Sequence, residues 1–212
     1  MGRMEKVPPD PPSALDRHAK AQTMTGSSPR KVETVFSSKW FSVEAHYNAN
    51  CGTEGEGQPF YKVKLADGVV VLPITTDNRY VLIRQYRPAL GRFTIEIPAG
   101  AVENGEAPET AATREVYEET GYRCTNFQLL GSGVLRIDRE DSCNHYFVAT
   151  GAVEESDFRA KEEIFPFTVT PDEFQSMVVN GAFDHTAALP LFVMGAWSFR
   201  MDFGLSNVMK VK

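Results

Sequence analysis

The stretch from Gly100 to Tyr122, GAVENGEAPETAATREVYEETGY, constrains this 212-residue chain more than any other segment. Its first half is predicted to be a loop, because Asn104-Gly105 is a turn dipeptide and Pro108 suits the first turn of a helix. Its second half predicts a helix that ends at Gly121, a position where a left-handed residue is favoured. We therefore expect a glycine-bounded loop that leads directly into a helix.

Three carboxylates share one face of this predicted helix. Glu115, Glu118 and Glu119 are spaced i, i+3 and i+4, which places them within a few ångströms of one another. One interpretation is a solvated acidic face, which is common on surface helices. The other is a site for a hard cation such as Mg²⁺, which takes one or two carboxylates together with waters and substrate phosphates. Acidity alone does not decide between the two.

The complete spacing of the stretch does decide. Gly100 is followed by Glu106 after five residues, and after seven more by the run Arg114-Glu115-Val116-Tyr117-Glu118-Glu119-Thr120-Gly121-Tyr122. This pattern resembles the signature of the Nudix hydrolases, G-x5-E-x7-R-E-U-x-E-E-x-G-U, where U is apolar. Every fixed position is matched, and an aromatic Tyr122 stands at the last U. A motif of this length carries far less risk of a chance match than a short one.

The resemblance extends beyond the motif and covers roughly residues 32–200. The segments VLIRQYRP (81–88) and IEIPAG (95–100) are similar to the subgroup of ADP-ribose and ADP-sugar pyrophosphatases. This resemblance implies a Mg²⁺ cofactor, with Mn²⁺ as a substitute. Its implied ligands are Glu115, Glu119, an assisting Glu118 and the backbone carbonyl of Ala99.

The same resemblance implies roles for residues around the metal. Glu106 would brace the loop by pairing with Arg114. Arg87 would bind the diphosphate of the substrate, with Glu96 beside it. The implied reaction is Mg²⁺-dependent hydrolysis of a nucleoside diphosphate linked to a sugar, with ADP-ribose or another ADP-sugar as the substrate, giving a nucleoside monophosphate and a sugar phosphate. Glu119 belongs to the catalytic set as well as to the metal ligands.

A general base is expected on a loop before a late strand, as in the resembling subgroup. Glu162 and Glu163 both precede Ile164, and we favour Glu163 slightly. An ordinary acidic loop is an equally open interpretation, because charged residues are common in loops.

One departure affects the substrate. The subgroup carries a proline about sixteen residues beyond the closing glycine of the motif, and Ile137 occupies that position here. This puts the sugar preference in doubt but leaves the reaction class intact. Arg136 and Asp138 are then hypothesised to line the pocket.

Composition limits the partners and the compartment. Twenty-two basic against 28 acidic residues give a net charge of −6, which argues against a sequence-independent nucleic-acid binder. The three cysteines are scattered and odd in number, which favours a reducing compartment, and we predict the cytoplasm. No run of about 18 apolar residues predicts a membrane span. The expected partners are a nucleotide-sugar and, by the resemblance, a second copy of the chain in a homodimer.

The chain is expected to be an α/β protein with three parts. A proline-rich tail (1–31) is predicted to be disordered, a strand region (32–65) is a possible dimerisation element, and a Nudix hydrolase domain spans 66–205. Strands on both sides of the motif helix predict a mixed sheet in an α/β/α sandwich, preceded by an antiparallel N-terminal strand region; the resemblance implies the same fold. Asp67-Gly68 predicts a tight hairpin between the strands 61–65 and 69–72.

Further local signals predict the end of the chain. Thr170-Pro171 is a strong helix start, with a capping side chain and proline at the first position. A final helix is expected over 184–197, bent or delayed by Pro190. Trp40 and Phe41 are expected to pack in the core rather than to stack on an adenine.

Two other functions compete with the enzyme. The first is a catalytically silent module that senses nucleotide-sugars. The intact set Glu115, Glu118 and Glu119 argues against it, because binding alone would not require all three. The second is an interaction protein that uses the proline-rich tail.

Overall fold

The structure is a computed structural model that describes residues 31–47, 59–159, 163–199 and 203. Contacts divide the chain into an N-terminal unit, which includes 42–62, and a larger unit, which holds residues 39–41 and everything from Val63 onward. The predicted tail lies outside the described residues except for Lys31, which begins the first strand.

The N-terminal unit contains β1, β2 and the first three residues of β3, strands that form a three-stranded sheet in the order β1-β2-β3. Its strands are β1 (Lys31–Ser37), β2 (Ser42–Tyr47) and β3 (Phe60–Lys64). β1 and β2 pair antiparallel, as expected for this region. Ala45 is fully buried, whereas Val32, Val35 and Phe36 are exposed.

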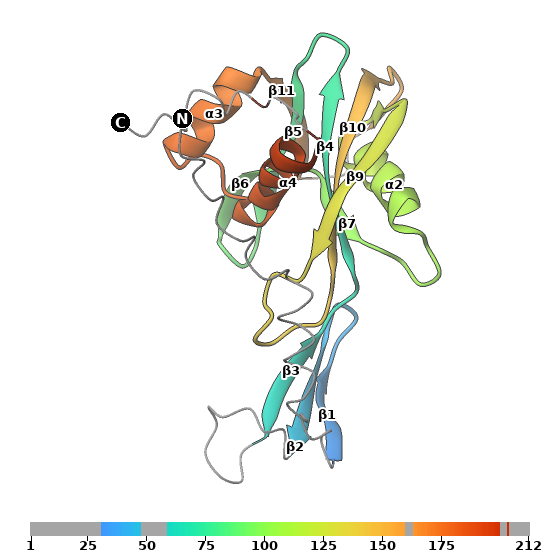
Figure 1. Ribbon diagram of the computed structural model, residues 1–212, viewed down its shortest axis with the longest axis vertical. Helices are drawn as coiled ribbons and strands as arrows, with labels where there is room; N and C mark the ends of the chain where they lie inside the picture. Colours follow the sequence, from blue (N-terminus) through green and yellow to red (C-terminus); the bar gives the residue numbers. More distant parts are fainter. Residues whose placement is uncertain (1–30, 48–58, 160–162, 200–202, 204–212) are drawn as a thin grey trace, which may run out of the picture. The chain divides into compact units, whose positions relative to one another are not determined.

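The larger unit is built on an eight-stranded mixed sheet (Figure 1). Its strands are β4 (Gly68–Thr75), β5 (Tyr80–Arg87), β6 (Arg92–Glu96), β7 (Ala99–Ala101), β8 (Tyr122–Arg123), β9 (Asn126–Gly133), β10 (Asn144–Glu154) and β11 (Ile164–Val169). The main order is β11-β5-β4-β10-β8, with β6 beside β5, β7 beside β4 and β9 beside β10. β4 and β10 run parallel, while the other pairs, such as β5 with β11, are antiparallel.

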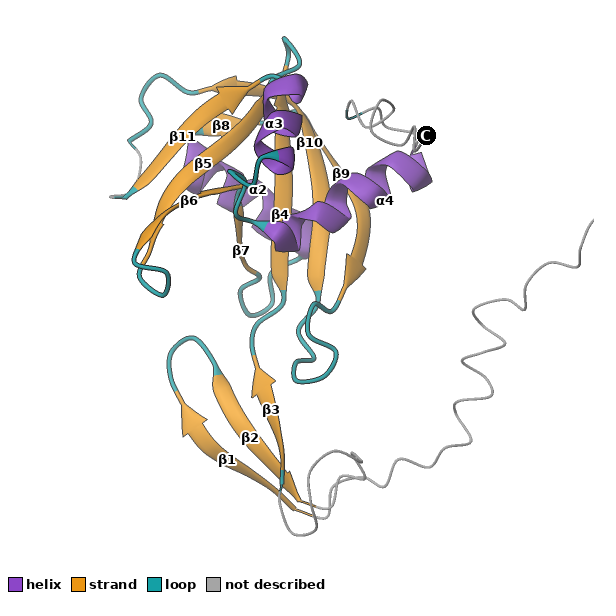
Figure 2. Cartoon of the chain, turned by 90° about the vertical axis from the view of Figure 1, so that its left-hand side faces the viewer, coloured by secondary structure: helices purple, strands orange, loops and turns teal. Residues whose placement is uncertain are grey.

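Helices cover both faces of this sheet. The motif helix α2 (Pro108–Thr120) lies on one face, and α3 (Pro171–Val179) and α4 (Leu189–Phe199), joined through a short 3-10 turn at Thr186–Ala188, lie on the other (Figures 1 and 2). Successive side chains of β4 point to opposite faces of the sheet and so contribute to both cores. Val69 and Val71 pack toward α2, whereas Val70 and Leu72 pack toward α3 and α4. The predicted α/β/α sandwich with a mixed sheet is confirmed.

The predicted hairpin at Asp67-Gly68 is wrong. β3 and β4 belong to different sheets, and β4 pairs with β5, β7 and β10 instead. The physical reason is that Val69, Val70, Val71 and Leu72 are all buried, so this strand needs a helix layer on each face and strands on each edge. A central strand of this kind takes its partners from distant parts of the chain.

The helix signals near the C-terminus are confirmed. Thr170 caps α3 in a capping box with Glu173, and Pro171 follows in the first turn. The last α-helix begins at Leu189, so Pro190 stands in its first turn, where a missing N–H is tolerated. No helix in the described ranges is long and apolar enough to cross a membrane. The core packing expected for Trp40 and Phe41 is wrong, since 75% of Trp40 and 40% of Phe41 is exposed.

Gly121 generates a test of how the motif helix ends. It has a left-handed φ of 74°, and a Cβ built on it would overlap the Phe158 ring. We expect Gly121→Ala to lower the free energy of unfolding by about 2 to 4 kcal/mol, from backbone strain together with displacement of the ring. Gly105→Ala is a matched control, because its φ is 79° but nothing lies within 4 Å. Urea unfolding that gives equal losses for both variants would contradict the packing role of Phe158.

Candidate active site

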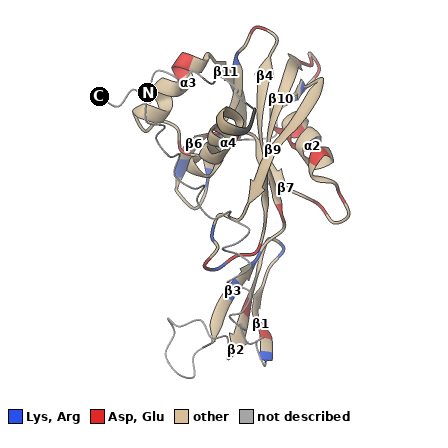
Figure 3. Cartoon of the chain, viewed as in Figure 1, with Lys and Arg blue, Asp and Glu red and all other residues tan. Residues whose placement is uncertain are grey.

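The motif loop and helix bring two carboxylates against strand β7. Gly100 pairs with Val69 of β4, and a Cβ at Gly100 would overlap the Glu115 carboxylate. Only a glycine therefore lets Glu115 approach the strand this closely without displacement. Figure 3 shows the acidic residues along α2.

Glu119 lies one turn further along the same helix. It is buried, and Oε2 accepts a hydrogen bond of 3.1 Å from the backbone N–H of Ala99. Burial raises the pKa of the Glu119 carboxyl to about 8, and the neighbouring Glu115 adds to this rise, while the Ala99 N–H and the positive charge of Arg87 oppose it. A carboxyl in such a place gains strongly from a bound cation.

Arg114 ties the loop to the helix. Its Nε and Nη2 donate to the two carboxylate oxygens of Glu106 at 3.0 and 2.9 Å, which confirms the expected pairing. Nη2 also donates to the Ala101 carbonyl at 2.9 Å, and Nη1 donates to Glu115 Oε1 at 2.6 Å. The Arg114 hydrogen bonds hold the pKa of Glu106 below its usual value. One guanidinium thus links loop, strand and helix.

Arg87 and Glu96 form a second charged unit. Arg87 Nε and Nη2 donate to Glu96 Oε1 and Oε2 at 2.7 and 2.5 Å, a two-point pair across the adjacent strands β5 and β6. Burial favours a raised pKa for Glu96, but the hydrogen bonds from Arg87 and Thr94 outweigh it and lower the pKa. The expected position of Glu96 beside Arg87 is confirmed. The pair occupies two of the five N–H donors of Arg87, and no other described residue takes the remaining three, which could bind a ligand.

Three neighbours of this pair were not found from the sequence. Thr94 is buried, and its hydroxyl lies 2.6 Å from Glu96 Oε1 and 3.1 Å from the Gln85 carbonyl oxygen. His185 interacts electrostatically with both Glu96 and Arg87. Alternation along β5 and β6 could have placed Thr94 and Gln85 on the face of Arg87, whereas nothing local in the sequence indicates His185.

The structure describes only one of the two candidate bases. Glu163 is exposed, has a left-handed φ of 73°, and its carbonyl accepts from the Tyr86 N–H at 3.4 Å. Its backbone therefore lies beside the strand that carries Arg87. Glu162 lies outside the described residues.

The hypothesised pocket residues of the β9–β10 loop are placed on its surface. Arg136 is mainly exposed and its nearest acidic partner is Glu140 at 3.6 Å. Ile137, at the position of the missing proline, is 87% exposed. These contacts link Arg136 to its own loop, and the role of Arg136 and Asp138 stays a prediction.

The donor set fits a hard divalent cation bound in part by other ligands. Within the described ranges, no group of three or more His, Cys, Asp or Glu side chains is arranged so that these side chains alone could hold a metal ion. Mg²⁺ does not need such a cage, because it usually keeps waters and takes one or two carboxylates with substrate phosphates. The carboxylates of Glu115 and Glu119, which approach β7 from α2, match this requirement.

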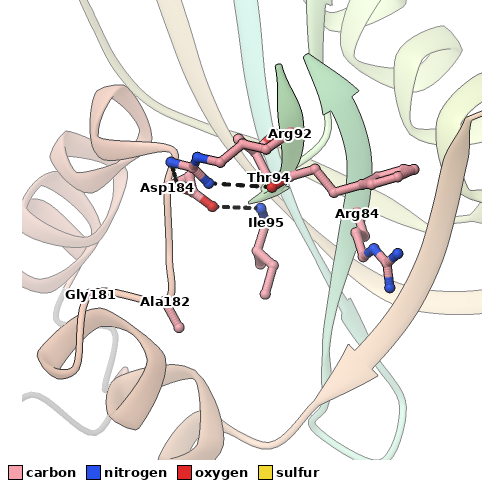
Figure 4. A pocket seen from close by; sticks show the side chains of 8 residues that line it. Arg84, Arg92, Thr94, Ile95, Gly181, Ala182 and Asp184 are labelled. Carbon is pink, nitrogen blue, oxygen red and sulfur yellow. Dashed lines mark hydrogen bonds and ion pairs between the residues drawn. The ribbon is translucent and has the colours of Figure 1, made fainter. Parts of the chain in front are cut away.

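A pocket of about 500 Å³ lies beside β5 and β6 (Figure 4). Arg84, Arg92 and Asp184 are among its lining residues. Asp184 closes the edge of β6: its Oδ2 accepts from Ile95 N–H at 3.0 Å and its Oδ1 from Arg92 Nη2 at 2.6 Å. The lining includes Thr94, which contacts Glu96, but neither Arg87 nor Glu96 nor the α2 carboxylates. We therefore do not assign the motif chemistry to it.

Comparison with known proteins identifies the family. Residues 64–192, more than half of the chain, match the NUDIX domain. The chain belongs to the NUDIX family.

Several curated relatives are similar over parts of their length. A methanol dehydrogenase activator of Bacillus methanolicus is 34% identical over 55% of this chain and 58% of its own. An ADP-sugar pyrophosphatase of Mus musculus is 46% identical over 29% of this chain and 30% of its own. An ADP-ribose pyrophosphatase of Bacillus subtilis (strain 168) is 37% identical over 41% of this chain and 47% of its own. The matches thus span 30% to 58% of these relatives.

A solved structure supports the fold. A crystal structure described as an ADP compounds hydrolase superposes with a TM-score of 0.64 at 19% identity, covering 81% of this chain and 92% of that chain. At this identity the likeness shows the fold alone.

The contact between Gly100 and Glu115 can be tested by stability. Gly100→Ala should push the Glu115 carboxylate away and break its bond with Arg114, with a loss of about 1 to 2 kcal/mol in the free energy of unfolding. Gly133→Ala is the matched control, because nothing lies within 4 Å of a Cβ there. In a Glu115→Ala background the effect of Gly100→Ala should largely disappear. An undiminished loss in that double variant would show that the overlap involves other atoms.

Proposed function

We propose that this chain hydrolyses the diphosphate linkage of a nucleoside diphosphate linked to a sugar, with ADP-ribose or another ADP-sugar as substrate. The products are a nucleoside monophosphate and a sugar phosphate. The observation that carries this proposal is the approach of Glu115 and Glu119 to β7 in a chain whose Arg87 is oriented by Glu96. The printed names of the mouse and B. subtilis relatives support the substrate class.

The proposed cofactor is Mg²⁺, with Mn²⁺ as a substitute. Glu115 and Glu119 would hold it, with Glu118 assisting and the Ala99 carbonyl as a further ligand. Bound there, the ion would neutralise phosphate oxygens and lower the pKa of a water. Glu118 suits an assisting role, because its side chain is about one third exposed and lies 3.9 Å from Arg114 Nη1.

The residues of the chain then have distinct tasks. The three remaining N–H donors of Arg87 bind the diphosphate, and Glu96 keeps the guanidinium in one orientation. A fixed positive charge beside the scissile linkage reduces the repulsion that phosphate oxygens exert on an attacking water. Glu163 accepts the proton of that water, with Glu162 as the other candidate. Glu106 and Arg114 hold the loop that presents Ala99 to Ala101.

A nucleotide-sugar-sensing module without turnover is the second candidate. The observation in its favour is the relative whose printed name is an activator of methanol dehydrogenase, since that name describes action on another enzyme. The intact carboxylates of α2 favour catalysis. A homodimer, a contribution of Arg136 to the pocket and a cytoplasmic location stay predictions. The exposed apolar side chains of the N-terminal sheet support the first of these.

Hydrolysis by the purified chain tests the proposal directly. With Mg²⁺, we expect AMP release from ADP-ribose or another ADP-sugar, and a roughly 100-fold or larger loss of kcat in Glu119→Gln. Mg²⁺ should also raise the melting temperature of the wild type more than that of Glu119→Gln, because only an intact site gains from binding. Nucleotide-sugar binding without turnover, in a protein stabilised by Mg²⁺, would instead favour the sensing module.

The choice of base can be made with two neighbouring variants. We expect Glu163→Gln to lower kcat by about 10² to 10⁴ with little change in KM, because the carboxylate acts only on the attacking water. Glu162→Gln is the matched control. A reversed order of the two effects would assign the base to Glu162, and two fully active variants would remove this loop from the mechanism.

A further inference from the structure

Arg84 on β5 carries a positive charge that no carboxylate pairs with among the residues that the structure describes. The residue is exposed, and its contacts are with two aromatic rings: Cζ lies 4.5 Å from the centroid of Phe93 and 5.9 Å from that of Phe165. A ring attracts the cation through its π electrons and, unlike a carboxylate, does not take up its in-plane N–H donors. The guanidinium is thus held in place while its donors stay available to a ligand.

The pocket beside β5 and β6 brings a second guanidinium to the same space. Arg84 and Arg92 both line it, and Figure 4 shows Arg84 across from Gly181 and Ala182. Asp184 is the one carboxylate among the lining residues, and each of its oxygens already accepts a hydrogen bond: Oδ1 from Arg92 at 2.6 Å and Oδ2 from β6 at 3.0 Å. The lining therefore carries a net positive charge, in a chain whose net charge is −6.

The edge of β6 adds a backbone donor to this lining. In an antiparallel pair, the N–H and C=O of every second residue point away from the partner strand. Ile95 is such a residue, since both its backbone groups bond to Asp184, so Phe93, two positions earlier, also points away from β5. The Phe93 carbonyl accepts from Arg92 Nη1 at 3.3 Å, whereas its N–H has no acceptor within the described ranges.

These groups select the chemistry of a ligand, because the free groups are donors and the carboxylate is already occupied. Arg92 uses two of its five N–H groups, so it also keeps donors. A phosphate monoester presents three acceptor oxygens and a charge of about −1.5 to −2, and can bond to two guanidinium groups at once. The volume of about 500 Å³ lies within the roughly 300 to 1,000 Å³ of small-molecule sites, and Ile95 and Ala182 supply apolar wall.

We propose that this pocket is a second anion site, which binds a phosphate monoester of sugar-phosphate size through Arg84, Arg92 and the Phe93 N–H. The site is separate from the Arg87–Glu96 pair, because neither member of that pair lines the pocket. The inference does not depend on the proposed function, since it uses no residue to which that function assigns a task.

Chemical protection tests the site in the unaltered chain. Phenylglyoxal, which modifies guanidinium groups, would be applied in EDTA with and without ribose 5-phosphate, and the modification of each arginine would be followed by mass spectrometry. At a concentration ten times Kd, ribose 5-phosphate should slow the modification of Arg84 about tenfold. Arg123 is the matched control, because it is also exposed and lies 4.1 Å from a ring centroid, that of Tyr117, but is paired with Glu155.

Calorimetry with variants tests the same site by affinity. The Arg87→Gln background removes the proposed diphosphate-binding residue, so that the titration reports the pocket. In that background, we expect Arg84→Gln to weaken ribose 5-phosphate binding roughly tenfold or more, and Arg123→Gln to leave it unchanged. Arg84→Lys should fall between, because it keeps the charge but not the planar fork of donors. Ribose without phosphate should not bind measurably.

Three results would overturn the inference: equal protection of Arg84 and Arg123, unchanged affinity in Arg84→Gln, or ribose binding as tightly as ribose 5-phosphate. Loss of all binding in Arg87→Gln, with Arg84 unprotected in the wild type, would also overturn it and place the phosphate at the proposed substrate site. Absence of hydrolysis with Mg²⁺ would overturn the proposed function alone, because neither measurement needs turnover.

Discussion

The contact between the α2 carboxylates and strand β7 is the constraint on which the rest of the site depends. Glu115 can lie against the strand only because Gly100 has no side chain, and Glu119 reaches the Ala99 N–H from the next turn. β7 is itself paired to β4, the buried centre of the sheet. The position of the helix over the sheet is therefore fixed at the place where its charges are concentrated.

Arg114 makes this concentration of charge tolerable. Glu106, Glu115 and the Ala101 carbonyl all accept its hydrogen bonds, so one cation offsets two carboxylates and one backbone dipole. Glu119 lies deeper and has no such direct cationic partner among the described residues; its pKa of about 8 is the consequence. Arg87 on β5 is paired with Glu96, so its positive charge is partly neutralised before it acts on Glu119. The side of the sheet facing α2 thus lacks positive charge where Glu119 is buried, which is the electrostatic condition a divalent cation satisfies.

Sequence reasoning succeeded where interactions are local. The Gly121 helix end and the Thr170 cap each connect residues within about one turn, so local patterns predicted them, and the family resemblance implied the Glu106–Arg114 pair across one loop. It failed at the Asp67-Gly68 hairpin, because a turn dipeptide says nothing about the distant strands that compete for β4. It also missed His185, which Asp184 brings to β6 across almost ninety positions of the chain. Such contacts depend on topology, which local patterns do not encode.

The two faces of the sheet divide stability and chemistry between them. Toward α3 and α4, the core contains aromatic rings whose centroids lie 4.9 to 5.7 Å apart. They belong to Tyr80, Phe174, Phe183 and Phe192, and buried aromatic pairs of this kind stabilise a core. Toward α2, the sheet faces the buried carboxyl of Glu119 on that helix, whose pKa is raised, and β5 carries the Arg87 guanidinium oriented by Glu96. A buried carboxyl would be replaced by an apolar group if stability were the only constraint. Its retention near Arg87 is what a site looks like when its ligand supplies the missing partner.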